Sequence, residues 1–272
     1  VLSAILWNFL FIPPIFTFHI GNPEDILMFA MYFTVALINA VLLYKLKKIE
    51  KKADLLNKKS KYSDPLTSFD WNKVNDSIIG TASLDTTCTI WDVNKETIKT
   101  QLIAHDKEVY DIAFGKDEST FMSTGADGSI RLFDLRSLDT CSVIFETQDL
   151  APFSRISWNF NNPNFVAALV MDKNYIYIID IRVANTPYAY LTYHTNVVNA
   201  VSWSPNSNAY ICSVGDDKNA LIWDIQLISN RTEDPLMCYT AENEIENVSW
   251  CESHDEWIGI TSMNSLQLLK VR

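Results

Sequence analysis

The strongest constraint on the fold is a repeat with a period of 42 to 47 residues, which runs from Leu66 to the end of the chain. The repeat is visible as two ladders of residues. In the first ladder an aromatic residue ends a short run of alternating apolar residues, and its members are Trp71, Phe114, Trp158, Trp203 and Trp250. In the second ladder an apolar residue precedes an aspartate, at Asp92, Asp134, Asp180 and Asp224. Two ladders with one period indicate successive copies of one structural unit.

Each copy of the unit is predicted to be a small β-sheet. In the second copy, Val109–Phe114, Phe121–Thr124 and Ser129–Phe133 are short β-branched or aromatic runs, separated by turn-forming residues such as Gly128. A period of about 40–45 residues with a terminal Trp-Asp is typical of the blades of a WD-repeat β-propeller. Such sheets cannot bury both faces alone, so neighbouring sheets must stack. We therefore predict an all-β fold, a β-propeller with five visible blades, over residues 65–272.

The first 46 residues have a different character. Residues 1–23 contain no charged side chain, and Ile26–Tyr44 is a second uncharged stretch. Each is long enough to cross a bilayer as a helix, although Pro13 and Pro14 would kink or break the first. We therefore predict an apolar and helical segment over residues 1–46, which is either a transmembrane hairpin or an artefact of the gene model. The lysine-rich linker that follows, residues 47–64, would place the propeller on the cytosolic side of a membrane.

The composition narrows the function classes. The net charge is −11, and the first 53 residues contain more lysine than acid, so the repeat region is more acidic than the whole chain. An acidic body repels a phosphate backbone, and we expect no direct contact with nucleic acid. The five cysteines are scattered without a C-x-x-C pair, which indicates reduced thiols in a cytosolic compartment. With seven glycines and no phosphate-binding loop, we expect neither a metal nor a cofactor.

The side chains that most resemble catalytic groups fit the repeat better than an active site. The fourth unit contains His194, Ser213, Asp217 and Trp223. The second unit contains a partial set, His105, Ser123 and Asp127. Such a set can form a structural tetrad in which imidazole, hydroxyl, carboxylate and indole bond one another inside a blade. No G-x-S-x-G motif accompanies Ser213, so we interpret the chain as a non-enzyme.

Several strings in the repeat region resemble one WD-repeat family. They are Pro65–Trp71, Asp85–Trp91, Thr100–Phe114, Gly125–Ser129, Ala220–Gln226 and Tyr239–Glu242. The family is that of the plant regulator TRANSPARENT TESTA GLABRA and the anthocyanin-eleven homologue, a cullin-RING-ligase associated WD-repeat protein. The resemblance covers about residues 54–272. It implies a seven-bladed propeller, of which about two blades would be missing, and a scaffold in the cytoplasm and nucleus that assembles kinases or transcriptional regulators.

The resemblance also implies an alternative function, the substrate receptor of a cullin-RING ubiquitin ligase. Receptors of this kind bind their adaptor through an arginine two residues after the aspartate that ends a blade. Two pairs match that motif, Asp134 with Arg136 and Asp180 with Arg182. Ordinary charge pairing on the surface explains the same residues equally well.

Two further expectations concern where partners would bind. For a scaffold, we expect contacts on the narrow top face, at residues that open the first strand of a unit: Glu108, Tyr110, Asn199, Glu244 and Glu246. Their mixture of acids and tyrosine suits basic peptide segments. A third hypothesis, a membrane-tethered trafficking component, depends on residues 1–46 alone.

Overall fold

The computed structural model describes residues 64–228, 234–254 and 256–271. The chain divides into two units, residues 1–63 and residues 64–272, and only the second is described here. The predictions of an apolar helical segment over 1–46 and of a linker over 47–64 therefore concern residues outside the described part, apart from Asp64. No helix in the described part has the length and apolar character needed to cross a bilayer.

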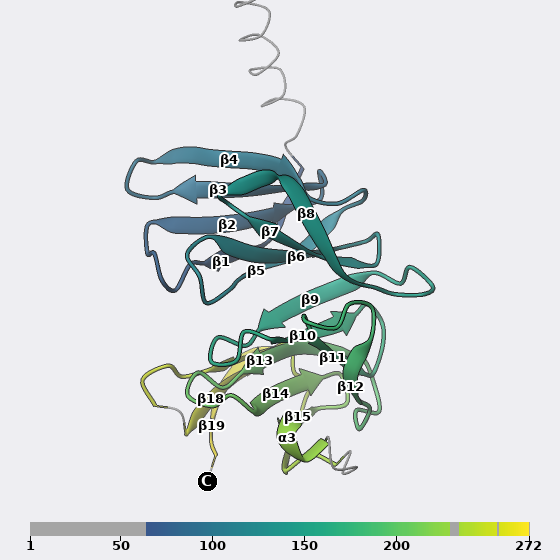
Figure 1. Cartoon of the computed structure of the whole chain (residues 1–272). Helices are drawn as coiled ribbons and strands as arrows, with labels where there is room; N and C mark the ends of the chain where they lie inside the picture. Colours follow the sequence, from purple (N-terminus) through teal and green to yellow (C-terminus); the bar gives the residue numbers. More distant parts are fainter. Residues whose placement is uncertain (1–63, 229–233, 255, 272) are drawn as a thin grey trace, which may run out of the picture. The chain divides into compact units, whose positions relative to one another are not determined.

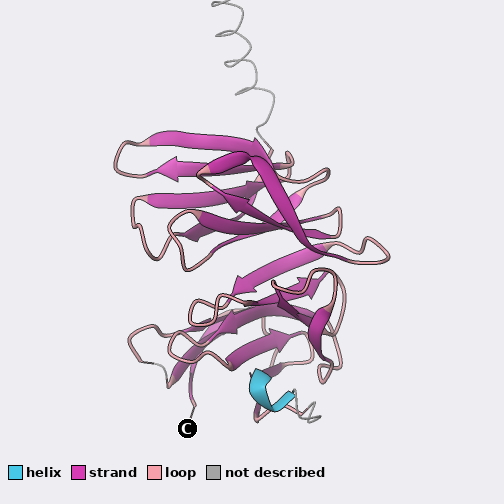
Figure 2. Cartoon of the chain, viewed as in Figure 1, coloured by secondary structure: helices cyan, strands magenta, loops and turns pink. Residues whose placement is uncertain are grey.

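The described residues form five antiparallel sheets in chain order (Figures 1 and 2). The first sheet consists of β1 (Leu66–Trp71), β2 (Ile78–Ser83), β3 (Thr87–Asp92) and β4 (Thr97–Ile103). The second consists of β5 (Val109–Phe114), β6 (Thr120–Gly125), β7 (Ser129–Asp134) and β8 (Ser137–Glu146). The third consists of β9 (Phe153–Trp158), β10 (Phe165–Val170), β11 (Ile176–Asp180) and β12 (Pro187–Leu191).

The last two sheets are less regular. The fourth consists of β13 (Val198–Trp203), β14 (Tyr210–Gly215), β15 (Asn219–Asp224) and β16 (Met237–Thr240). The short helix α3 (Ile225–Ile228) follows β15. The fifth sheet has three strands, β17 (Asn247–Trp250), β18 (Trp257–Ser262) and β19 (Ser265–Lys270). The predicted all-β class and the five repeats are confirmed. The three strands predicted in the second repeat are also confirmed, with ends within one residue.

Neighbouring sheets stack through their first strands. β1 packs on β5, β5 on β9, β9 on β13, and β13 on β17. At the first of these junctions a Cβ on Gly80 would lie 2.7 Å from Cδ1 of Ile112, so the glycine leaves the space that the next sheet fills. Apolar residues from facing sheets form the cores, one of which joins the first sheet to the second and includes Ile90, Phe114 and Phe121.

The aromatic ladder shows where stacking stops. Trp203 is 7% exposed and its indole N–H donates to the Ser157 carbonyl of the preceding sheet at 2.9 Å. Trp250 makes the equivalent bond to the Ser202 carbonyl at 3.0 Å. Trp71, at the same position of the first sheet, has no preceding sheet in the described part and is 47% exposed. Among the described strands, β1 and β17 make no more than marginal contact, so the two end sheets do not stack as the others do.

Candidate binding surfaces and the central pocket

The polar set of the fourth sheet lies inside the sheet. Nε2 of His194 lies 2.8 Å from Oγ of Ser213, and its Nδ1 lies 2.9 Å from Oδ2 of Asp217. The indole N–H of Trp223 donates to the same Ser213 hydroxyl at 2.9 Å. His194, Ser213 and Trp223 are all buried. Burial lowers the pKa of His194 despite the neighbouring carboxylate, and the hydroxyl of Ser213 faces side chains of its own sheet rather than solvent.

The second sheet contains a related set with one partner that the sequence reasoning missed. His105 lies 2.8 Å from Oγ of Ser123 and 2.9 Å from Oδ1 of Asp127. Arg131 adds an ion pair to Asp127 at 2.9 Å. Burial alone would raise the pKa of Asp127, but the hydrogen bond and charge of His105 outweigh it and hold that pKa below its usual value. Phe133 stands at the tryptophan position and stacks on another ring of the core instead of donating a hydrogen bond.

The two Asp-x-Arg pairs have the same geometry. In one pair Nε and Nη2 of Arg136 donate to the carboxylate of Asp134 at 2.9 and 2.6 Å. In the other, Nε and Nη2 of Arg182 donate to Asp180 at 2.9 and 2.6 Å. Both pairs stand at the ends of third strands, β7 and β11, of consecutive sheets. The arginine side chains remain 72% and 62% exposed, so each guanidinium is held in place by its own aspartate and still faces solvent.

The five residues expected on the top face have different surroundings. Glu108, Glu244 and Glu246 are exposed, and Tyr110 is half-buried on β5. Asn199 already has a structural role. Its Nδ2 donates to Oδ1 of Asp216 at 2.6 Å and to the carbonyl of Ile245 at 2.9 Å, which connects the fourth sheet to the chain that enters the fifth. The three glutamates are therefore the accessible members of this group.

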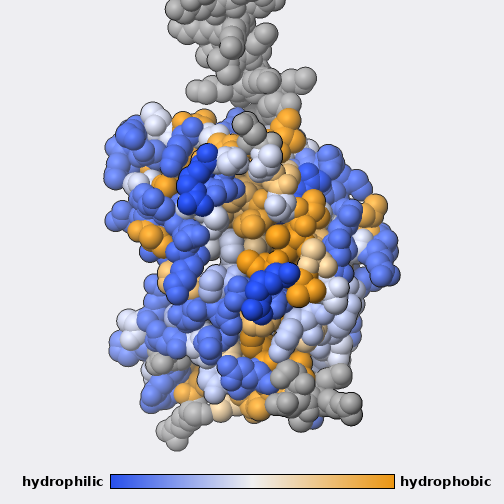
Figure 3. All heavy atoms as spheres, in the orientation of Figure 1, coloured by the Kyte–Doolittle hydropathy of each residue, from blue (hydrophilic) through white to orange (hydrophobic). Residues whose placement is uncertain are grey.

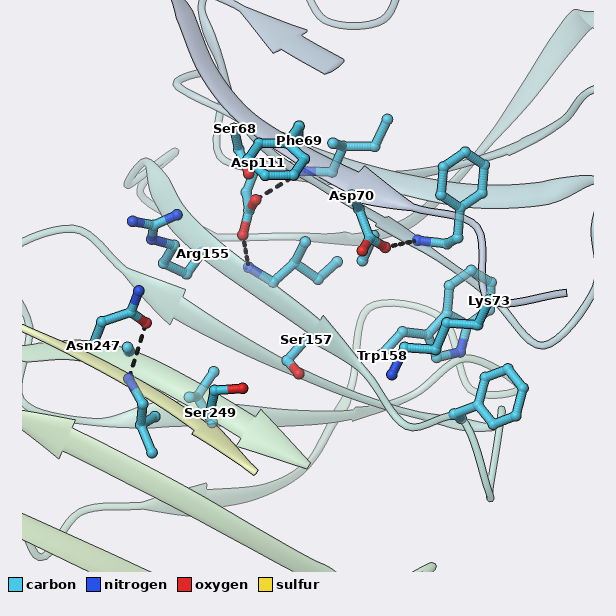
Figure 4. A pocket seen from close by; sticks show the side chains of 18 residues that line it. Ser68, Phe69, Asp70, Lys73, Asp111, Arg155, Ser157, Trp158, Asn247 and Ser249 are labelled. Carbon is cyan, nitrogen blue, oxygen red and sulfur yellow. Dashed lines mark hydrogen bonds between the residues drawn. The ribbon is translucent and has the colours of Figure 1, made fainter. Parts of the chain in front are cut away.

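A pocket that the sequence reasoning did not find lies where the first strands of all five sheets meet. Its volume is about 420 Å³ (Figure 4). One residue of each first strand, three positions before the aromatic residue of the ladder, lines it, and we call these five the arginine tier: Ser68, Asp111, Arg155, Ala200 and Asn247. Lys73 and Phe160 also line it, and Lys73 forms an ion pair at 2.9 Å with Glu252 of the fifth sheet. The tier joins five different residue types, so no ladder in the sequence marks it.

Two carboxylates on the pocket wall connect adjacent first strands. Oδ2 of Asp70 on β1 accepts the N–H of Phe114 on β5 at 2.7 Å. Oδ2 of Asp111 on β5 accepts the N–H of Ile156 on β9 at 2.8 Å. Burial raises the pKa of both groups, that of Asp70 to about 6. These acids therefore act as clamps between sheets.

The Asp70 clamp predicts a specific pH dependence. Its pKa of about 6 in the fold exceeds the value of about 3.9 for an unfolded chain. A raised carboxyl pKa contributes stability that is complete below the unfolded value and is lost as the pH rises through the folded value. Relative to Asp70→Asn, the wild-type chain should therefore lose stability between about pH 4 and pH 7. Melting curves of both chains across this range test it, with Asp64→Asn, an exposed position, as the control; a constant difference would contradict it.

The described residues hold no group of three His, Cys, Asp or Glu side chains that could bind a metal ion. All five cysteines are free, and Cys88 and Cys212 are buried. Burial raises the pKa of both thiols to about 12, so neither provides a thiolate nucleophile near neutral pH.

Comparison with known proteins separates the two parts of the chain. Residues 96–134 and 185–224 match the family "WD domain, G-beta repeat", and residues 1–55 match "Domain of unknown function (DUF4118)". The DDB1- and CUL4-associated factor 7 homolog of Dictyostelium discoideum is 47% identical over 225 residues, which cover 83% of this chain and 69% of that protein. This relative bears the ligase-associated name and not that of the plant regulator.

Two fungal proteins extend the comparison. An uncharacterized WD repeat-containing protein of Schizosaccharomyces pombe is 36% identical over 76% of this chain and 61% of its own length. A WD repeat-containing protein of Saccharomyces cerevisiae is 31% identical over 76% of this chain and 53% of its own length. The chain thus spans between about half and two thirds of these relatives. Together with the stacked sheets and their paired ladders, the identities show that this chain belongs to the WD-repeat family of the DDB1- and CUL4-associated factor 7 homolog.

Proposed function

We propose that this chain is a non-enzymatic scaffold that holds other proteins, among them a kinase or a transcriptional regulator, in the cytoplasm and nucleus. The burial of the fourth-sheet set carries the proposal. His194 and Ser213 are enclosed within one sheet and bonded to Asp217 and Trp223, so the groups that resemble a hydrolase have no access to a substrate. In the described part, strand edges and loops of the sheets remain accessible to partners.

The surface of the propeller region suits protein contacts. Figure 3 shows hydrophobic residues in a broken band that runs from top to bottom of one face, with hydrophilic residues on both sides. Large apolar side chains that remain exposed include Val143 on β8 and Tyr188 and Tyr190 on β12. Exposed apolar surface with a polar rim is characteristic of protein–protein interfaces.

The three exposed glutamates give this proposal a test. The combined change Glu108→Gln, Glu244→Gln and Glu246→Gln should weaken co-precipitation of a tyrosine-regulated dual-specificity kinase several-fold, because it removes the charges that would attract a basic segment. The loss should be largest at low salt, since exposed charges are screened. Glu96→Gln, in an exposed turn between β3 and β4, is the control. Undiminished capture at low salt would exclude these positions as the contact.

A second candidate function is supported by the two Asp-x-Arg pairs and by the name of the Dictyostelium relative. In this alternative the chain is a substrate receptor of a cullin-RING ligase, and the outer edges of the two guanidinium groups contact the adaptor. Guanidinium groups already oriented by a carboxylate lose little rotamer freedom on binding. The hypothesis of a membrane-tethered trafficking component depends on residues 1–46, which lie outside the described part, and no observation favours it.

The double variant Arg136→Ala with Arg182→Ala tests the ligase alternative. Capture of the DDB1-type adaptor should fall about tenfold or more if these residues are hot spots of the interface. Loss of the Arg136 pair should cost little stability because that pair is exposed, but Asp180 is buried, so melting curves must establish that the double variant remains folded. Lys95→Ala is a matched control, since Lys95 pairs with the blade-ending Asp92 at 2.9 Å on the first sheet. Equal capture by the double variant and the wild-type chain would exclude the arginines.

A further inference from the structure

The polar groups that line the central pocket fall into two sets: carboxylates that already have hydrogen-bond partners, and donors that have none or few. On the side of the first and second sheets, the carboxylates already have partners. Asp111 accepts backbone N–H groups on both oxygens, from Ile112 at 3.0 Å and from Ile156 at 2.8 Å. Asp70 likewise accepts the N–H of Trp71 at 3.0 Å and that of Phe114 at 2.7 Å. These acids therefore have little capacity left for a ligand.

The side formed by β9, β13 and β17 carries donors instead. The guanidinium of Arg155 makes no hydrogen bond or ion pair with any residue that the structure describes, and it is exposed. Asn247 uses its Oδ1 to accept the N–H of Val248 at 2.9 Å, which leaves its amide N–H₂ available. Ala200 stands between these two residues in the arginine tier and places only a methyl group there. Figure 4 shows Arg155 and Asn247 at one end of the pocket, away from Asp70 and Lys73.

Two hydroxyl groups lie further along the same strands and add to the donors on this side of the pocket. Ser157 on β9 and Ser249 on β17 stand two residues after Arg155 and Asn247 and also line the pocket. The hydroxyl of Ser157 bonds to no residue in the described part. That of Ser249 makes only a long bond of 3.4 Å to the carbonyl of Trp250. A guanidinium, an amide and two hydroxyls therefore line the same pocket.

The chemistry of this wall selects a carboxylate. A guanidinium presents parallel N–H donors whose spacing matches the two oxygens of a carboxylate, and an amide N–H₂ can complete the set. Arg155 is the one cation of this wall, and its charge is partly offset by Asp111, a carboxyl whose pKa burial raises although Arg155 acts to lower it. A monoanion therefore suits the site better than a phosphate dianion, which usually requires several cations. A volume of about 420 Å³ is within the range of small-ligand sites and can hold a short acidic side chain.

We propose that the central pocket binds a carboxylate group against Arg155 and Asn247, either that of a free dicarboxylate or that of a glutamate or aspartate side chain of a partner protein. None of the Asp-x-Arg residues and none of the three exposed glutamates lines this pocket. The inference goes beyond the scaffold function and does not depend on it.

Arginine labelling on the full chain tests the proposal. Phenylglyoxal modifies accessible guanidinium groups, and mass spectrometry reports each site separately. Arg155 should be labelled faster than Arg136 and Arg182, which are occupied by their own aspartates and serve as internal controls. A capped peptide Gly-Gly-Glu-Gly-Gly, at about three times its Kd, should slow labelling of Arg155 about fourfold. The matched peptide with glutamine in place of glutamate should leave the rate unchanged.

Two other probes separate the sources of the carboxylate. Protection by glutarate that equals protection by the glutamate peptide supports a free dicarboxylate, whereas protection by the peptide alone supports a side chain of a partner. Inorganic phosphate should protect less than either. The proposal is overturned if the glutamate and glutamine peptides protect equally, if no probe protects Arg155, or if phosphate protects best.

A variant of the second donor completes the test. Asn247→Leu removes the amide at nearly constant volume and should raise the peptide concentration needed for half-protection of Arg155 about tenfold, the effect of one lost hydrogen bond to a charged group. Asn94→Leu, at an exposed turn residue outside the pocket, is the matched control. Melting curves establish that both variants remain folded. An unchanged half-protection concentration in folded Asn247→Leu would exclude the amide from the site and overturn the proposed geometry.

Discussion

His194→Ala is expected to lower the free energy of unfolding by about 3 kcal/mol, because it breaks a buried hydrogen-bond network. His194 is 1% exposed and connects Ser213 to Asp217. Its removal leaves the carboxylate of Asp217 with backbone donors alone, from Thr195 and Asn219 at 3.1 Å. The indole N–H of Trp223 would still donate to the Ser213 hydroxyl, but that hydroxyl would have lost its hydrogen bond with the imidazole.

Thermal unfolding measures this loss directly. For a domain of about 200 residues, about 3 kcal/mol corresponds to a fall in Tm of roughly 6–12 °C. His254→Ala is the matched control, because His254 is exposed and its Nδ1 bonds only the neighbouring Ser253. If the Tm of His194→Ala stays at the wild-type value, the set is not a structural tetrad, and the interpretation of the chain as a non-enzyme loses its main support.

The sequence predicts the sheets well because their signals are local. Strands such as Val109–Phe114 are runs of β-branched and aromatic residues between turns, and both ends are visible in one short window. The ladder of aromatic residues predicts five repeats for the same reason. The ladder does not tell whether another sheet packs against a given aromatic residue. Trp71 and Trp203 occupy equivalent positions, yet within residues 64–271 only Trp203 has a preceding sheet to pack on, so the two differ in burial.

The candidate sites depend on distances between repeats, and these are harder to predict. The Asp-x-Arg pairs are contiguous in sequence, so their local bonding follows from the motif. The ion pair of Arg131 with Asp127, also within one sheet, was missed because arginine is not part of the usual tetrad pattern. Asn199 was expected to face a partner, but its amide reaches the carbonyl of Ile245, which only the stacking of sheets brings near.

The stacking also predicts a backbone position that tolerates no side chain. Gly215 ends β14 opposite Val198 of β13. A Cβ at Gly215 would collide with the carbonyl oxygen of Val197 and lie 3.2 Å from the carbonyl carbon. The atoms it meets belong to the backbone, and the N–H of Asp216 donates to the same Val197 carbonyl at 2.9 Å, so the strand cannot move aside without losing that bond.

Gly215→Ala should therefore destabilise the chain by about 2–3 kcal/mol, the upper part of the usual range for overpacking a well-packed site. Gly259→Ala is the matched control, since Gly259 also lies in a second strand, β18, but has no atom within 3.8 Å of the added carbon. There alanine should be neutral or stabilise by up to about 1 kcal/mol, because a strand glycine loses more entropy on folding. Urea unfolding measures the free energy of unfolding of both variants. Gly215→Ala places its methyl group against a backbone carbonyl, whereas Gly259→Ala places it on an open face of the sheet. Similar losses in both would mean that glycine is required by strand conformation in general, whereas a loss confined to Gly215→Ala would show that close approach of β13 to β14 is what requires it.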